Sequence, residues 1–118
     1  MERVGGIIFL KVNGQQLRAK GNFTFNLGRP RRESVVGSDS VHGYKEMPQV
    51  GFIEGEITDS SQMSLQTLLD TKDATVTLEL ANGKVVALRE AVFAGEGTGN
   101  TEEGNIAVRF EGQGEEIR

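Results

Sequence analysis

The residues best suited to chemistry lie together in one stretch, residues 28–48, which reads GRPRRESVVGSDSVHGYKEMP. This stretch holds the only histidine and the only tyrosine of the chain, both of its prolines and three arginines. The side chains of interest are Arg29, Pro30, Arg31, Arg32, His42, Tyr44, Glu46 and Pro48. Three uses would explain the cluster: an active site, a grip on nucleic acid, or a loop through which chains assemble.

Patterns typical of catalysis or metal binding are sparse. His42 has no second histidine at ligand spacing, and the absence of cysteine excludes disulfides and thiolate metal sites. Glu54 and Glu56 are two apart on a predicted strand, which places their carboxylates about 7 Å apart on one face, and paired carboxylates can do acid–base work. Glutamates that alternate on a solvated strand are far more common, so we expect no enzyme, no metal and no cofactor.

The glycine-rich run GEGTG at residues 95–99 is similar to a phosphate-binding loop. Such loops bind phosphate where a strand runs into the N-terminus of a helix. Here the chain continues as NTEEG, which is acidic and leads into another predicted strand. We therefore interpret this run as a flexible acidic loop.

Nucleic-acid binding through the three arginines of residues 28–48 is also disfavoured. Useful affinity for phosphates takes about six or more well-placed cations, and single strands need aromatic side chains for stacking. Tyr44 is the one aromatic residue nearby, and acidic residues interrupt the basic ones. The whole chain carries a net charge of −4, so the arginines are better explained by solvation or by ion pairs with another protein chain.

The charge is unevenly distributed along the chain. Residues 1–50 contain eight Lys/Arg and four Asp/Glu, a net +4, whereas residues 51–118 contain five and thirteen, a net −8. A solvated surface can have this pattern. The alternative hypothesis is that a basic surface of one copy contacts an acidic surface of the next. The acidic partner residues would be Glu96, Glu102 and Glu103.

Alternation with a period of two residues predicts a mainly β chain that forms a single domain over residues 1–118. Two hairpins are expected, residues 7–20 and 75–89, each closed by an Asn-Gly type I′ turn. Further strands are expected over 22–27, 49–58, 91–94 and 106–112, with RESVV at 32–36 as a further candidate. One short helix is predicted over about 60–70, capped by Asp59. The rest of residues 29–48 is predicted to be a long inter-strand loop.

Three short runs, residues 7–10, 85–88 and 91–94, are apolar at consecutive positions. Both faces of such a strand need burial, whereas a small antiparallel sheet normally exposes one face to water. We therefore expect another copy of the chain to cover part of this surface. Residues 7–10 are also far too short for a secretory signal or a membrane span, which favours a cytoplasmic protein or a particle assembled in the cytoplasm.

The order and spacing of these elements resemble a known family, the tail tube proteins of contractile-tailed, Mu-like bacteriophages. The resemblance lies in KVNGQQLRAKGNF (11–23), GSDSVHGYKEMPQVGFIEGEITD (37–59), DATVTLELANGKVVAL (73–88) and IAVRFEGQGEEI (106–117). It implies an antiparallel β-sandwich or barrel-like subunit with one flanking helix. No single one of these motifs is diagnostic, and the resemblance rests on their joint order over almost the whole chain.

The resemblance further implies a structural virion protein without catalytic activity. Six copies would form a ring, and stacked rings would form a tube that delivers the genome. The tail sheath would lie outside, the tape-measure protein and passing DNA inside, and baseplate and terminator proteins at the ends, with assembly in the host cytoplasm and no membrane partner. The alternatives are a type VI secretion-like tube protein and a monomeric β-sandwich module that binds a carbohydrate or peptide.

Two groups of residues acquire expected roles in such a tube. An acidic channel would repel phosphates and let DNA slide, and the candidates to line it are Glu54, Glu56 and Glu79. Residues 29–48 would be an assembly arm that reaches the next subunit or ring and becomes ordered there.

Overall fold

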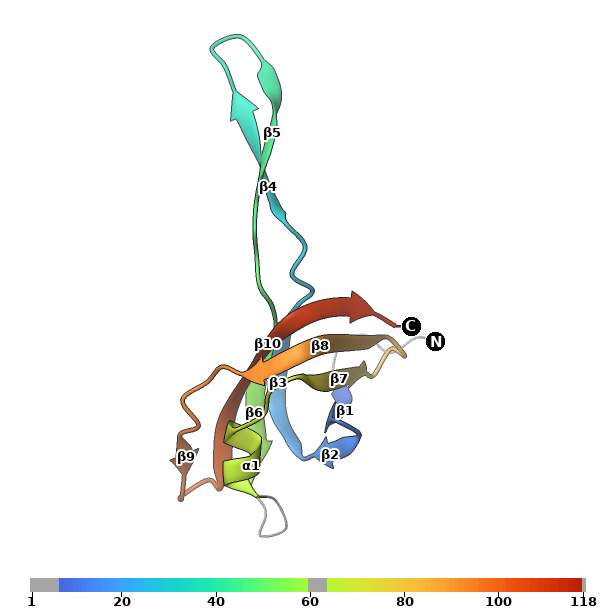
Figure 1. Ribbon diagram of the computed structural model, residues 1–118, viewed down its shortest axis with the longest axis vertical. Helices are drawn as coiled ribbons and strands as arrows, with labels where there is room; N and C mark the ends of the chain where they lie inside the picture. The colour runs from blue at the N-terminus through green and yellow to red at the C-terminus, as the bar shows by residue number, and fades with distance from the viewer. Residues whose placement is uncertain (1–6, 60–63, 118) are drawn as a thin grey trace.

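A computed structural model of the protein describes residues 7–59 and 64–117 and is built mainly of β-strands (Figure 1). The elements are β1 (Ile7–Val12), β2 (Gln15–Leu17), β3 (Ala19–Asn26), β4 (Arg31–Val36), β5 (Val41–Met47), β6 (Gly51–Thr58), α1 (Leu65–Leu69), β7 (Ala74–Leu80), β8 (Val85–Phe93), β9 (Gly99–Asn100) and β10 (Asn105–Glu116). One antiparallel sheet has the order β2-β1-β7-β8-β10-β6-β3, with β9 paired to β10. Strands β4 and β5 form a separate two-stranded sheet.

The large sheet curls into a nearly closed barrel. The first half of β10 pairs with β6 and its second half with β8, with a register shift between Glu111 and Gln113. This long, bent strand joins a wall of β1, β7 and β8 to a wall of β6 and β3. The two ends of the sheet then approach each other, since the edge strand β3 contacts β1, which lies next to the other edge strand β2. The predicted barrel-like β fold is confirmed.

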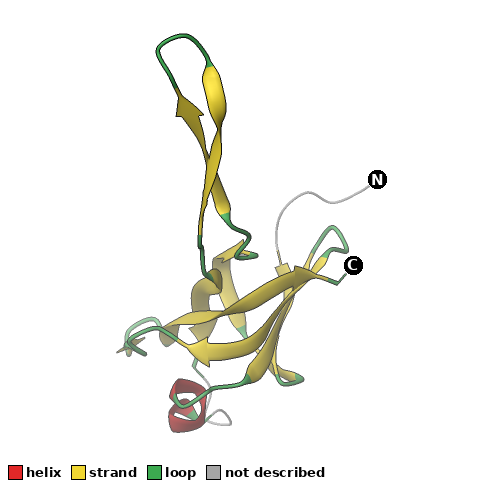
Figure 2. Cartoon of the chain, turned by 45° about the horizontal axis from the view of Figure 1, so that its top comes forward, coloured by secondary structure: helices red, strands yellow, loops and turns green. Residues whose placement is uncertain are grey.

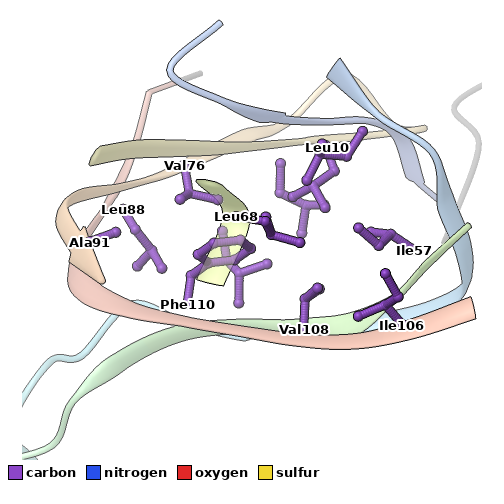
Figure 3. Packing of buried hydrophobic residues seen from close by; sticks show 12 residues of the cluster. Leu10, Ile57, Leu68, Val76, Leu88, Ala91, Ile106, Val108 and Phe110 are labelled. Atoms are coloured by element: carbon purple, nitrogen blue, oxygen red, sulfur yellow. The ribbon is translucent and has the colours of Figure 1, made fainter. Parts of the chain in front are cut away.

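The core lies between the two walls (Figure 3). Val76 of β7 and Leu10 of β1 face Ile106, Val108 and Phe110 of β10 across the interior, and each of these side chains is at least 98% buried. A fully buried aliphatic or phenyl side chain stabilises the fold by about 1.5–3 kcal/mol. Alternate residues of β7 and β10 therefore hold the walls together, as the period-two pattern predicted.

The two Asn-Gly turns differ in conformation. In the first hairpin Asn13 and Gly14 have φ of 50° and 84°, as the predicted type I′ turn requires. In the second, only Gly83 has positive φ, at 94°, and its N–H donates to the Leu80 carbonyl at 3.0 Å. Ala81 adds a third residue to this loop, which makes it a type I turn followed by a left-handed glycine. The type I′ prediction is wrong for this turn.

Helix α1 is shorter than predicted and starts later. Its N-cap is Ser64, whose hydroxyl accepts the Thr67 N–H at 3.3 Å. Asp59, the predicted cap, instead donates its backbone N–H to the Gly104 carbonyl at 2.8 Å. Residues 60–63 of the predicted helix lie outside the described residues. The prediction of one short helix is confirmed. Among the described residues, no helix has the length and apolar character that a membrane span requires.

The chain itself covers one of the three consecutive apolar runs. All four side chains of residues 85–88 in β8 are at most 8% exposed, so this run needs no cover from a second copy, and cover of the remaining apolar surface by a second copy stays a prediction. In the run 91–94, Val92 is 41% exposed. In the run 7–10, Leu10 is buried, and the side chains of residues 7 and 8 lie outside the described part.

The segment predicted as a long loop is instead a two-stranded hairpin that projects from the barrel (Figures 1 and 2). Strands β4 and β5 pair in antiparallel register from Arg31 opposite Met47 to Val36 opposite Val41. The radius of gyration is 17.1 Å, whereas a compact chain of this length would have about 13.5 Å. The longest axis is 62 Å and the next is 38 Å, because the hairpin extends away from the barrel. We call β4 and β5 the projecting hairpin.

Glycines allow the chain to leave the barrel at the base of this hairpin. The Gly114 N–H donates to the Leu27 carbonyl at 3.2 Å, just after β3 ends. A Cβ on Gly114 would lie 2.6 Å from that carbonyl oxygen, and a Cβ on Gly51 would lie 2.6 Å from the Gly112 carbonyl oxygen. Both contacts are to backbone and cannot relax cheaply. The crossing of β3, β6 and β10 therefore requires residues without a side chain.

Replacing Gly114 with alanine should lower the free energy of unfolding by about 1–3 kcal/mol, because the new methyl group overpacks a backbone contact. The matched control is Gly99→Ala, where the nearest atom to the added Cβ is 3.8 Å away. Urea denaturation followed by far-ultraviolet circular dichroism measures both. Equal stability of the two variants would contradict the close crossing.

Candidate assembly surface

The projecting hairpin exposes apolar side chains on one face near its tip. Residues opposite each other in an antiparallel ladder share a face, and the register places Val36 opposite Val41 and Tyr44 opposite Ser34. Val36, Val41 and Tyr44 are 69%, 63% and 62% exposed, and we call them the distal apolar face. Exposed apolar patches of this kind mark interaction surfaces.

The charged side chains of the hairpin pair largely with one another. Arg32 lies 3.3 Å from Glu46 and 5.3 Å from the centroid of the Tyr44 ring. Glu33 forms ion pairs with Arg31, at 2.9 Å, and with Lys45, at 3.6 Å. Exposed ion pairs contribute about 0–1 kcal/mol each, so they orient these side chains more than they stabilise the hairpin. Arg31 and Arg32 therefore already have partners within the hairpin.

The tip is a short turn in which the single histidine has a packing role. The Gly37 N–H donates to the Ser40 carbonyl at 2.8 Å. The His42 ring lies over Gly37, where an added Cβ would be 2.2 Å from the ring, and His42 Nε2 lies 3.2 Å from Asp39 Oδ1. The Asp39 side chain is 81% exposed. The tip therefore presents a carboxylate to its surroundings, next to the distal apolar face.

A groove of about 560 Å³ lies at the other end of the hairpin, and we call it the base groove. Its lining residues are Leu27, Gly28, Arg29, Gln49, Val50, Gly51, Val92, Glu111, Gly112, Gln113 and Gly114. Val50 and Val92 are 48% and 41% exposed. Gln49 secures one side, since its Nε2 donates to Asn26 Oδ1 at 3.2 Å and to the Arg29 carbonyl at 3.4 Å. Sequence reasoning missed this groove because its glycines and valines come from four separate segments.

The predicted channel residues Glu54 and Glu56 lie together on the outer face of β6. They line a groove of about 590 Å³, the carboxylate groove, with Lys20, Asn22, Thr24, Gly55, Gly95, Glu96, Ala107, Val108 and Arg109. Asn105 donates a hydrogen bond to Glu56. Glu96 of the predicted acidic loop therefore joins this groove.

Arg109 organises the carboxylate groove, and the sequence analysis did not identify it. Its guanidinium pairs with Glu54, donates from Nε to Glu111 at 2.8 Å, and lies 4.2 Å from the centroid of the Phe52 ring. The hydrogen bonds to Glu111 and Glu54 raise the pKa of Arg109 above its ordinary value. The guanidinium therefore stays charged and holds both carboxylates in place. The only sequence signal was the alternation of Arg109 with inward residues of β10.

The third predicted channel residue, Glu79, lies elsewhere. It is on β7, in the wall across the core from β6 and β10 (Figure 3), and it pairs with Lys11 at 3.5 Å. Glu79 therefore does not share a surface with Glu54 and Glu56, so the three residues do not form one cluster in a subunit.

The predicted acidic partner residues lie at the opposite end of the molecule from the hairpin. Glu102 and Glu103 are in the turn between β9 and β10 (Figure 1). The Glu103 side chain accepts a hydrogen bond from Asn105 at 3.3 Å. Any contact between these residues and the hairpin arginines would have to be between copies, and that contact stays a prediction.

Comparisons with known proteins bear on the chain as a whole. Residues 1–116 match a family described as phage tail tube protein. The tail tube protein of Escherichia phage Mu is 30% identical over 91 residues, which cover 77% of this chain and 76% of the phage protein. The family match includes the barrel and the projecting hairpin, and it confirms the resemblance found in the sequence.

Replacing Arg109 with alanine should lower the free energy of unfolding by about 1–2 kcal/mol, because Glu54 and Glu111 lose a charged hydrogen-bond donor. Arg89→Ala is the matched control, since among the described residues Arg89 forms an ion pair only with Glu115 and its side chain is 58% exposed. The Arg89→Ala control should lower the free energy of unfolding by less than about 0.5 kcal/mol. Urea denaturation at low and high salt gives both values, and equal losses would contradict the organising role of Arg109.

Proposed function

This chain belongs to the phage tail tube protein family, and we propose that its copies form hexameric rings that stack into the tube through which the genome passes. Membership makes the protein a structural component of the phage tail. The observation that carries the finer proposal is the projecting hairpin, whose distal apolar face is more than 60% exposed. In a subunit of a polymer, this surface would be covered by a neighbour.

The hairpin suits the role of an assembly arm. A two-stranded sheet alone in water is marginally stable, so contact with a second copy would stabilise it as well as bury its apolar face. Pro30 and Pro48 flank the strands, and a residue without an N–H ends strand pairing there. His42, Tyr44 and Glu46 belong to this arm, and its contacts would link neighbouring subunits or rings.

The remaining partners follow from the architecture of a contractile tail. The sheath would surround the tube, the tape-measure protein and then the DNA would occupy its channel, and baseplate and terminator proteins would cap its ends. DNA would pass without sequence-specific binding. Assembly would take place in the host cytoplasm.

We assign the channel surface to the wall formed by β3, β6 and the first half of β10. On the opposite wall, which includes the second half of β10 where it pairs with β8, three carboxylates each have a cation as a partner: Glu79 has Lys11, Glu116 has Lys84 and Glu115 has Arg89. The carboxylate groove instead has three carboxylates and two cations in its lining, and Arg109 is shared with Glu111 as well. A surplus of negative charge would repel DNA phosphates and favour sliding.

Replacing residues 31–47 with a short glycine linker should abolish tubes and leave the barrel folded, because among the described strands β4 and β5 pair only with each other. Negative-stain electron microscopy and sedimentation of the purified protein measure assembly, and far-ultraviolet circular dichroism measures folding. The unmodified protein should form rings or tubes under the same conditions. A parent protein that stays monomeric at 12.8 kDa, even at high concentration, would instead favour a ligand-binding module.

A pair of threonine-to-cysteine variants tests the channel assignment, since the chain has no cysteine of its own. Thr24 lines the carboxylate groove, and Thr75 is an exposed residue on β7 in the opposite wall. In assembled tubes, a bulky maleimide polymer should label Thr75→Cys and spare Thr24→Cys, because it cannot enter a narrow channel. A small maleimide should label both, and rapid bulky labelling of Thr24→Cys would place that wall outside.

A further inference from the structure

The two ends of the projecting hairpin are complementary in shape and charge, and we propose that the tip of one copy docks in the base groove of a neighbouring copy. The proposal rests on the assembly function above and names the contact that the arm makes. In this contact the distal apolar face of one copy packs against Val50 and Val92 of the other. Asp39 of the first copy forms an ion pair with Arg29 of the second.

The apolar parts of the two surfaces correspond. The distal apolar face supplies two valines and the only tyrosine, and residues of this kind, above all tyrosine, act as interface anchors. Few large apolar side chains of the barrel are exposed in the described part of the chain, and two of these, Val50 and Val92, line the base groove. Burying both sets together would cover five of the nine large apolar side chains that are exposed in the described part of the chain.

The floor of the base groove suits a strand or an aromatic ring. Four glycines line it, Gly28, Gly51, Gly112 and Gly114, and they contribute backbone without side chains. At about 560 Å³ the groove has the size of sites that enclose small ligands, about 300–1,000 Å³. The Tyr44 ring and one adjacent valine would fit within this volume.

Charge decides which way the hairpin enters. Arg29, at the edge of the groove, has no ion pair among the described residues. Asp39 is 81% exposed at the tip, and His42 is its partner in the described part of the chain. Strand β4 holds these two residues roughly 20 Å apart, at about 3.3 Å per residue. They therefore cannot pair within one chain, but they would meet if the tip of one copy reached the base of the next.

The docking is directional. The hairpin tip and the base groove are different parts of the same molecule. Each copy can therefore insert its tip into one neighbour and bind the tip of another neighbour in its base groove. Repeated contacts of this heterologous type generate rings or filaments. Successive copies would be offset by about the length of the hairpin.

A charge swap tests the ion pair. Asp39→Arg or Arg29→Asp alone should raise the protein concentration needed for assembly about tenfold, since close interfacial charge pairs are strongly coupled. The double variant Asp39→Arg/Arg29→Asp should assemble nearly as well as the parent. As a control, Arg18→Asp, at another exposed arginine of the barrel, should not rescue Asp39→Arg. Single variants that assemble normally, or a folded double variant that is not rescued, would overturn the pairing.

Cysteine cross-linking tests the apolar contact directly. Val36→Cys protein mixed with Val92→Cys protein should form a disulfide-linked pair after assembly and oxidation, because a disulfide requires Cβ atoms about 3.5–4.5 Å apart. Val36→Cys mixed with Leu65→Cys is the control, since Leu65 is similarly exposed, at 38%, but lies on α1. Polymers that show no Val36–Val92 cross-link, or that cross-link to Leu65 instead, would overturn the docking. If even the parent chain forms no polymer, it is the proposed function that fails.

Discussion

Strand β10 belongs to both walls of the barrel, and the rest of the structure depends on that sharing. Its first half pairs with β6 and its second half with β8, so it must bend and let β3 cross close to it. Gly112 and Gly114 allow this, because Arg89 and Ala91 occupy the space that a side chain on Gly112 would need, and the backbone of Leu27 occupies the space that one on Gly114 would need. The same crossing determines where the chain leaves the barrel and forms the base of the projecting hairpin.

The interactions within the projecting hairpin orient its side chains more than they stabilise it. The ion pairs of its arginines and lysine lie in its proximal half, at Arg31, Arg32 and Lys45, whereas its distal half holds the Asp39–His42 contact and exposes valines and a tyrosine. Exposed ion pairs contribute little stability, so rearranging the hairpin would cost little free energy. Burial of its distal apolar face would stabilise it. Assembly would then supply the burial that a free subunit lacks, as expected for a member of the tail tube family.

Much of the fold could be predicted from the sequence, because the relevant signals are local. Period-two alternation identified most strands, Asn13-Gly14 identified a two-residue turn, and the order of motifs indicated the family. The site was only partly predictable. Residues 32–36 were a strand candidate, but the rest of residues 29–48 was predicted to be a loop because glycine, serine and charged residues obscure the alternation, although residues 31–47 form two paired strands. The helix began at a different cap because Asp59 and Ser64 are both good capping residues.

The class of fold, the family and the unusual composition of residues 28–48 could therefore be obtained from the amino-acid sequence, since each depends on neighbours along the chain. Tertiary structure alone decided which surfaces these residues form. It brought Glu54, Glu56 and Glu96 to one groove around Arg109, and it placed Glu79 across the core. It covered residues 85–88 within one chain and assembled the base groove from four distant segments. The physical reason is that strand pairing joins residues far apart in sequence, and no local pattern records which strands will be neighbours.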